Sequence, residues 1–279
     1  MKWILVYAAL CISARLCFAV DEEVCLADPA LYKNDGVYYL YGTEGFWAPQ
    51  ILDYQGKVTM LYTANRQIAV AFADHPTGPF VQKDIRALNK DLSEIDPFLF
   101  QDEDETLYLY HVRKNQGNHI YVAEMEDDLS GIKEETLKHC ISVQNGTWEN
   151  TPDFSSEEIA EGPTLIKRKG TYYLLYSANH FMSINYGVGY ATAPSPTGPW
   201  TRYSGNPIIR REFLGINGTG HGDIFMDGDD MYYVLHTHAS NEEVRPRHTM
   251  LVKMGFQEAD SGIDKIVVNY DTATYLHQN

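Results

Sequence analysis

The feature that most constrains the fold of this chain is a repeat that occurs five times. Each copy contains a short run of aromatic, β-branched and other apolar residues, the composition of a half-buried strand. These runs are residues 37–41, 58–62, 107–110, 172–176 and 232–236. A turn signal precedes each run, and a short apolar segment that opens with a polar cluster precedes the turn. Repeats of strand, tight turn and strand at intervals of tens of residues are typical of a β-propeller.

A second repeated element supplies further strands. Residues 68–73 lead into a turn rich in Pro and Gly at 74–80, and residues 187–192 lead into a closely similar turn at 193–200. Weaker copies follow the third and fifth runs. Each full repeat therefore predicts four short antiparallel strands, the content of one propeller blade. We predict an all-β chain folded as a single five-bladed β-propeller.

Polar clusters, here called the openers, begin the first strand of every copy. They are Asp28-Pro29, Trp47-Ala48-Pro49, Asp96-Pro97, Glu161-Gly162-Pro163 and Gly220-His221-Gly222-Asp223. The later openers follow one another at intervals of 49 to 65 residues, but only 19 residues separate Asp28 from Trp47. We therefore predict a shortened first blade. The C-terminal strand at 265–270 is one candidate to complete it, since propellers often close by pairing their ends.

Three of the openers carry a carboxylate: Asp28, Asp96 and Glu161. Strands that begin at the axis place their first residues in a shared central cavity, and buried acidic residues are rare unless paired or functional. Glycoside hydrolysis requires one protonated and one ionised carboxyl group. A third carboxylate raises the pKa of its neighbour by like-charge repulsion. Each of the three alone fits an ordinary strand-edge turn, whereas together they predict a catalytic centre on the axis.

The five openers, in this order, resemble the motifs of glycoside hydrolase family 43. That family comprises five-bladed propeller enzymes, including α-L-arabinofuranosidases, β-xylosidases and arabinanases, and the resemblance runs from about residue 27 to 256. It implies that Asp28 is the general base that activates water, Glu161 the general acid, and Asp96 the third carboxylate that tunes the acid. It also implies inversion at the anomeric carbon, with base and acid about 6.5–9.5 Å apart.

The resemblance implies further site residues. His221 resembles the family's axial histidine, which often contacts a central calcium or sodium ion, and it is equally compatible with a cap on a turn. Arg247 matches a substrate-facing arginine, although Arg245 is close by. Trp47 fits either a platform for stacking sugars or core packing. The resemblance implies a possible structural calcium at the axis and no cofactor required for the chemistry.

The net charge limits the partners that we expect, and the N-terminal residues indicate the cellular compartment. The formal net charge of −16 argues against nucleic acid and anionic membranes as partners, and is compatible with a neutral sugar polymer. Lys2, an apolar stretch at 3–12 and Cys17-Phe18-Ala19 predict an export signal over residues 1–19, followed by one domain over 20–279. That stretch is too short for a membrane span. We expect a periplasmic or secreted protein rather than a lipoprotein.

The leading hypothesis is therefore an exported glycosidase that acts on arabinose- or xylose-containing oligosaccharides or polysaccharides. An α-L-arabinofuranosidase is favoured over a β-xylosidase. The alternative is a non-catalytic carbohydrate-binding propeller derived from such an enzyme, because the shortened first blade adjoins the expected base.

Overall fold

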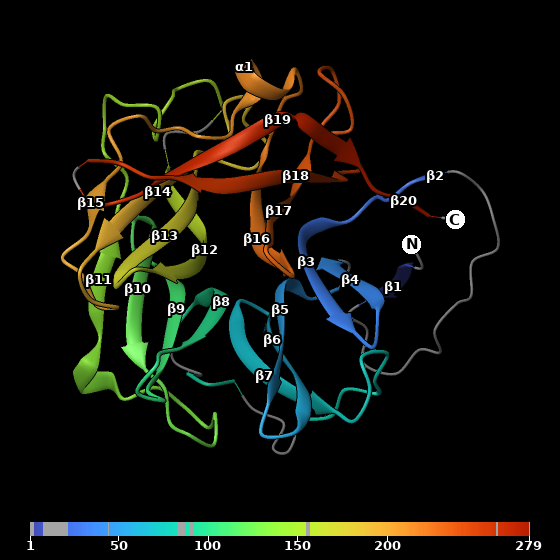
Figure 1. Ribbon diagram of the computed structural model, residues 1–279, viewed down its shortest axis with the longest axis vertical. Coiled ribbons are helices and arrows are strands. Elements are labelled where there is room, and N and C mark those ends of the chain that lie inside the picture. Colours follow the sequence, from blue (N-terminus) through green and yellow to red (C-terminus); the bar gives the residue numbers. More distant parts are fainter. Residues whose placement is uncertain are drawn as a thin grey trace.

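The protein folds as a five-bladed β-propeller, as predicted, with a first blade shorter than the others (Figure 1). The structure, a computed structural model, describes residues 3–7, 22–43, 45–82, 87–89, 92–154, 157–260 and 262–278. Blade 1 contains β3 (Ala27–Asn34) and β4 (Val37–Thr43). Blade 2 contains β5 (Trp47–Tyr54), β6 (Lys57–Ala64) and β7 (Gln67–Ala73).

The three remaining blades each have four strands. Blade 3 contains β8 (Glu94–Gln101), β9 (Leu107–Lys114), β10 (Gly117–Glu124) and β11 (Lys138–Ile141). Blade 4 contains β12 (Glu158–Arg168), β13 (Thr171–Ala178), β14 (Gly187–Ala193) and β15 (Thr201–Arg202). Blade 5 contains β16 (Gly220–Asp227), β17 (Asp230–Thr237), β18 (His248–Gln257) and β19 (Lys265–Tyr275). A 3-10 helix (Glu134–Thr136) and α1 (Arg211–Leu214) lie in the connections.

A separate apolar cluster fills each interface between neighbouring blades. The alternation of side chains along a strand explains how one strand serves two interfaces. On β13, Tyr172, Leu174 and Tyr176 pack toward blade 3. Tyr173 and Leu175, the residues between them, pack toward blade 5. The aromatic runs of the sequence are therefore apolar on both faces because both faces of each blade are covered.

Residues 22–24 and 276–278 close the ring between blades 1 and 5. The strand β2 (Glu22–Glu23) pairs with β20 (His277–Gln278). Next to it, Val24 donates its backbone N–H to the carbonyl of Leu276 at 2.7 Å, and the carbonyl of Val24 accepts from the N–H of Thr249 at 2.8 Å. Residues 24 and 276 thereby join the inner end of blade 1 to β18 of blade 5.

The C-terminal strand β19 does not complete blade 1, so the prediction that residues 265–270 close the first blade is wrong. It pairs antiparallel with β18 and is the outermost strand of blade 5. The reason is apolar burial, because Ile266 of β19 is 3% exposed within the cluster between blades 4 and 5.

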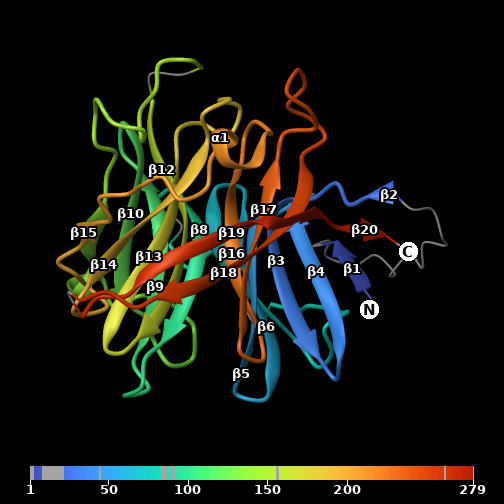
Figure 2. The same cartoon turned by 45° about the horizontal axis from the view of Figure 1, so that its top comes forward.

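The outer edge of blade 1 is covered instead by β1 (Trp3–Tyr7), which pairs in parallel with β4 (Figure 2). These residues belong to the predicted export signal. The expected cleavage site, near residue 19, lies outside the described residues, so export and removal of this segment stay predictions. Within the described part of the chain, no helix is long and apolar enough to cross a membrane.

A β-bulge interrupts the first strand of every blade at its opener. The register between the first and second strands shifts at this point in all five blades. At each bulge one residue has a positive φ, between 41° and 58°, namely Asp28, Ala48, Asp96, Gly162 and His221. This conformation is uncommon for residues other than glycine. Bulges bend a strand and redirect its side chains, so these five positions form a matched set around the axis.

The same five residues tie each blade to the one before it. Each donates its backbone N–H to a side chain of the preceding blade, so that the amide is satisfied away from the strand ladder. The pairs are Asp28 to His236 Nδ1 (3.2 Å), Ala48 to Thr43 Oγ1 (3.2 Å), Asp96 to Thr63 Oγ1 (3.0 Å), Gly162 to Asp96 Oδ2 (3.1 Å) and His221 to Ser177 Oγ (2.8 Å). We call this set the opener ring.

Thr63→Val tests the opener ring, because valine keeps the shape of threonine and removes the acceptor. Thr63 is fully buried, so the N–H of Asp96 is left unpaired, and we expect the free energy of unfolding to fall by about 1–3 kcal/mol. Urea unfolding measures the change. Thr201→Val at an exposed position of β15 is the matched control, with an expected change within about 0.5 kcal/mol. Equal changes in both variants would contradict a structural role for the ring.

Candidate active site

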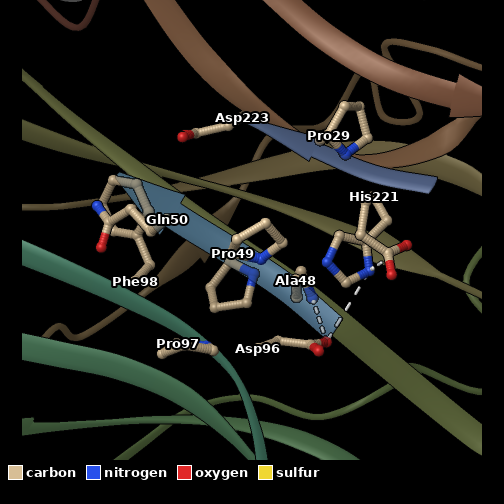
Figure 3. Close-up of a pocket in the computed structure, with 13 residues that line it drawn as sticks. Pro29, Ala48, Pro49, Gln50, Asp96, Pro97, Phe98, His221 and Asp223 are labelled. Carbon is tan, nitrogen blue, oxygen red and sulfur yellow. Dashed lines mark hydrogen bonds and ion pairs between the residues drawn. The ribbon is translucent and has the colours of Figure 1, made fainter. Parts of the chain in front are cut away.

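A pocket lies on the propeller axis where the openers of the five blades meet (Figure 3). Its walls come from the bulge residues and the residues that follow them. The lining residues are Asp28, Pro29, Ala48, Pro49, Gln50, Asp96, Pro97, Phe98, Gly162, Pro163, His221, Gly222 and Asp223. Four prolines in matching positions give the pocket rigid walls, because the proline ring fixes φ.

Asp28 begins blade 1 and is held by three neighbouring groups. Thr43 donates its hydroxyl to Asp28 Oδ2 at 2.5 Å, and Arg247 donates from Nη1 to Oδ1 at 3.1 Å. Nδ1 of His221 lies 3.7 Å from Oδ1. Burial raises the pKa of Asp28, but the positive charges of His221 and Arg247 outweigh it and hold the pKa well below its usual range. Asp28 is therefore an ionised carboxylate at neutral pH, although it is buried.

His236 of β17 lies behind Asp28 and is fully buried. Its Nδ1 is 3.2 Å from the backbone N and 3.3 Å from Oδ1 of Asp28. Burial, together with the adjacent Arg247, lowers the pKa of His236 to about 3. The ring is therefore neutral near pH 7 and acts as a fixed support for Asp28 rather than as a second cation.

Asp96 begins blade 3 and shares the pocket with Asp28. Its Oδ2 accepts the N–H of Gly162 at 3.1 Å and lies 3.9 Å from Nδ1 of His221. Burial raises the pKa of Asp96 to about 7, and the charges of Glu161 and Asp28 add to the rise. His221 works in the opposite direction. Two buried aspartates beside one histidine therefore differ in protonation near neutral pH, one ionised and one able to carry a proton.

Glu161 begins blade 4, next to the glycine that binds Asp96. Its two carboxyl oxygens have different donors: Tyr186 donates its hydroxyl to Oε1 at 2.8 Å, and Asn118 donates from Nδ2 to Oε2 at 2.9 Å. Burial and the charge of Glu161 raise the pKa of Tyr186 well above its usual range, so its hydroxyl keeps its proton. The Tyr186 ring stacks on His236 at 5.7 Å, which links the support of Glu161 to that of Asp28.

His221 of blade 5 lies within ion-pair distance of both Asp28 and Asp96, and Figure 3 shows its ring beside Asp96. Burial lowers the pKa of His221. The carboxylates of Asp28, Asp96 and Glu161 raise it by more than burial lowers it, so the net shift is upward. The described residues include no group of three or more His, Cys, Asp or Glu placed to hold a metal ion. The axial calcium implied by the resemblance stays a prediction.

The two other predicted site residues lie at the edge of this cluster. Arg247 pairs with Asp28 and places its guanidinium 4.7 Å from the centre of the Phe181 ring. Arg245 also lies over Phe181 but forms no ion pair with the described carboxylates of the site. Trp47 immediately precedes the pocket residue Ala48 and is 42% exposed, so its indole is not core packing.

Several residues of the site were not found from the sequence. Asn118, Tyr186 and His236 lie outside the openers, and they reach the carboxylates only because of how neighbouring blades pack. Asp223 belongs to the fifth opener, but nothing in the sequence pattern assigns it a role. It lines the pocket and accepts from Thr164 at 2.7 Å, and burial raises its pKa to about 6.

Comparison with known proteins identifies the family. The model of the glycosyl hydrolases family 43 matches residues 41–261. The chain belongs to glycosyl hydrolase family 43. The matched residues include Asp96, Glu161 and His221, whereas Asp28 lies just before them.

Individual relatives differ in their named activities. A crystal structure of an endo-1,4-beta-xylanase from Bacteroides thetaiotaomicron has a TM-score of 0.82 and 35% identity, over 91% of this chain and 97% of that one. A beta-D-galactofuranosidase of Aspergillus niger is 34% identical over 59% of this chain and 44% of its own length. A xylosidase/arabinosidase of Butyrivibrio fibrisolvens is 26% identical over 69% of this chain and 38% of its own. The chain thus spans less than half the length of these two curated relatives.

The electrostatic link between Asp28 and His221 can be tested in this family 43 chain without a substrate. After burial, Asp28 makes the largest contribution to the pKa of His221, and it raises that pKa. In Asp28→Asn the pKa of His221 should therefore fall. Titration of the imidazole signals by NMR measures it. His139 of β11 is the control, because Asp28 is not among the groups that shift its pKa. An unchanged His221 titration would show that the two residues do not share the pocket.

Proposed function

We propose that this chain is an exported, inverting glycoside hydrolase that removes terminal pentose residues. An α-L-arabinofuranosyl group is the preferred substrate and a β-D-xylosyl group the next. The observation that carries the proposal is the difference between the buried carboxyl groups of one pocket. Asp28 is kept ionised by His221 and Arg247, whereas Asp96, beside Glu161, retains a proton up to about pH 7.

Each carboxyl group has a distinct part in the proposed reaction. Asp28 removes a proton from a water molecule, which attacks the anomeric carbon. Glu161 gives a proton to the leaving oxygen, and the bond between that oxygen and the anomeric carbon breaks. The third carboxyl group, Asp96, lies beside Glu161, and the two share a proton near neutral pH because closely placed carboxylates do not all ionise together. Tyr186 and Asn118 orient the carboxyl group of Glu161.

Two residues next to the pocket residues are assigned to substrate positioning. Trp47, exposed at the start of blade 2, provides an aromatic face for a sugar ring, and Arg247 donates toward the same carboxylate as the attacking water. The named activities of the relatives support furanose or pentose substrates: galactofuranoside, xyloside and arabinoside. Arabinofuranose and xylopyranose present similar hydroxyl arrangements to the carboxylates, so a direct comparison of substrates is required.

The test is hydrolysis of a matched panel of 4-nitrophenyl glycosides: α-L-arabinofuranoside, β-D-xyloside and β-D-galactofuranoside. We expect the arabinofuranoside to have the highest kcat/KM. NMR during hydrolysis of the best substrate should show a first-formed sugar of inverted anomeric configuration, because water attacks directly. Retention would contradict the role given to Asp28. Sugar binding without turnover of any substrate would identify a carbohydrate-binding protein instead of an enzyme.

Glu161→Gln tests the proton donor. Loss of a general acid reduces the rate by about 10²–10⁴-fold on a substrate whose leaving group needs protonation, such as an oligosaccharide. The rate of hydrolysis of an activated aryl glycoside should fall far less, because its leaving group departs without a proton. The control is Glu158→Gln on the same strand, where the carboxylate accepts from Asn145 instead of from Tyr186 and Asn118. Equal losses on both substrates would show that Glu161 is not the acid.

A further inference from the structure

Three stacked rings lie between Arg247, the partner of Asp28, and the surface of the molecule. Phe154 stacks on His180 with ring centres 4.6 Å apart and an angle of 26° between the planes. His180 stacks on Phe181 with nearly the same geometry, 4.6 Å and 28°. We call Phe154, His180 and Phe181 the aromatic ladder. The ladder is separate from the five clusters that fill the interfaces between blades.

The inner end of the ladder contacts the catalytic cluster. The Arg247 guanidinium, which binds Asp28, lies over the ring of Phe181. His180 is near the acid, because the charge of Glu161 acts on it. The ladder residues come from the connections that enter β12 and that join β13 to β14, at the end of blade 4 where Glu161 lies.

The outer end of the ladder is open. Phe154 remains 49% exposed although one of its faces rests on His180. A half-exposed phenylalanine on a surface connection gains little for folding, since apolar side chains stabilise a fold when they are removed from water. Charged groups lie near the middle ring of the ladder, because Lys114 and Glu157, an ion pair at 3.8 Å, both act on His180.

The two connections that carry the ladder are held together before any ligand binds. Asn179, which precedes His180, is 4% exposed and has a φ of 73°. Its Oδ1 accepts from the backbone N and the hydroxyl of Thr151, at 2.8 and 2.9 Å. Its Nδ2 donates to the carbonyls of Trp148 and Asn185. One buried side chain therefore clamps both connections, and the ladder is a preformed surface.

We propose that the aromatic ladder binds the sugar on the leaving-group side of the scissile bond, with Phe154 as its outer stacking surface. This inference rests on the proposed function. Glu161 protonates the leaving oxygen, so whatever lies just outside Glu161 faces the leaving group. An aromatic face with neighbouring polar groups suits a sugar ring, which has apolar C–H faces and hydroxyl edges. The ladder thus selects oligosaccharides or polysaccharides over simple glycosides.

The experiment compares two substrates with the same terminal pentose. One is the pentosyl fluoride, whose leaving group is too small to reach the ladder. The other is an oligosaccharide with at least two sugars beyond the scissile bond. For Phe154→Ala we expect kcat/KM on the oligosaccharide to fall roughly 5- to 10-fold, and kcat/KM on the fluoride to stay the same. Phe154→Tyr, which keeps the ring, should retain activity on both substrates.

The control variant is Phe213→Ala. Phe213 is 44% exposed and stacks on Tyr270 of β19 at 5.1 Å, so it matches Phe154 in exposure and stacking and lies at the outer edge of blade 5. In this variant kcat/KM should stay the same for both substrates. Unchanged fluoride hydrolysis also shows that Phe154→Ala is folded.

The outcomes separate this inference from the proposed function. Suppose that the unsubstituted chain turns over both substrates. If Phe154→Ala then lowers kcat/KM equally on both, or on neither, the role of the ladder is overturned and the enzyme assignment stays in place. Turnover of neither substrate by the unsubstituted chain would overturn the proposed function and the ladder with it.

Discussion

The hydrogen bonds of the opener ring are the constraint on which the site depends. At each bulge the positive φ turns a backbone N–H away from its strand, and a side chain of the preceding blade accepts it. The same contact fixes the angle between two blades and the direction of a pocket side chain. Because it recurs in all five blades, the position of each catalytic candidate depends on its neighbour, and the pocket is a property of the closed ring.

Closure of the ring concentrates negative charge on the axis, and the distribution of positive charge decides what each acid can do. Asp28 is adjacent to both Arg247 and His221, whereas Asp96 has His221 and two carboxylates as neighbours. Their pKa values therefore shift in opposite directions in the same buried setting. This difference supports Asp28 as the ionised base and leaves Asp96 able to share a proton with the neighbouring Glu161.

The shortened first blade adjoins the proposed base and leaves its support in place. Asp28 is held by Thr43 at the end of β4, and by His236 and Arg247 of blade 5. All of these contacts are made at the inner end of blade 1. The missing strands belong to the outer part of that blade, where β1 now pairs with β4. Loss of outer strands therefore changes the wall of the propeller without removing a contact of Asp28.

The sequence by itself determined the repeat, the number of blades and the openers, because strand periodicity and turn residues are local signals. It was wrong about β19, since pairing of that strand depends on which blade interface can bury Ile266. It could not identify His236, Tyr186 or Asn118, whose contacts with the acids span at least 25 residues in the chain. The tertiary structure alone decided the protonation of Asp28 and Asp96, because a pKa depends on burial and on charges that the chain brings together only when the ring closes.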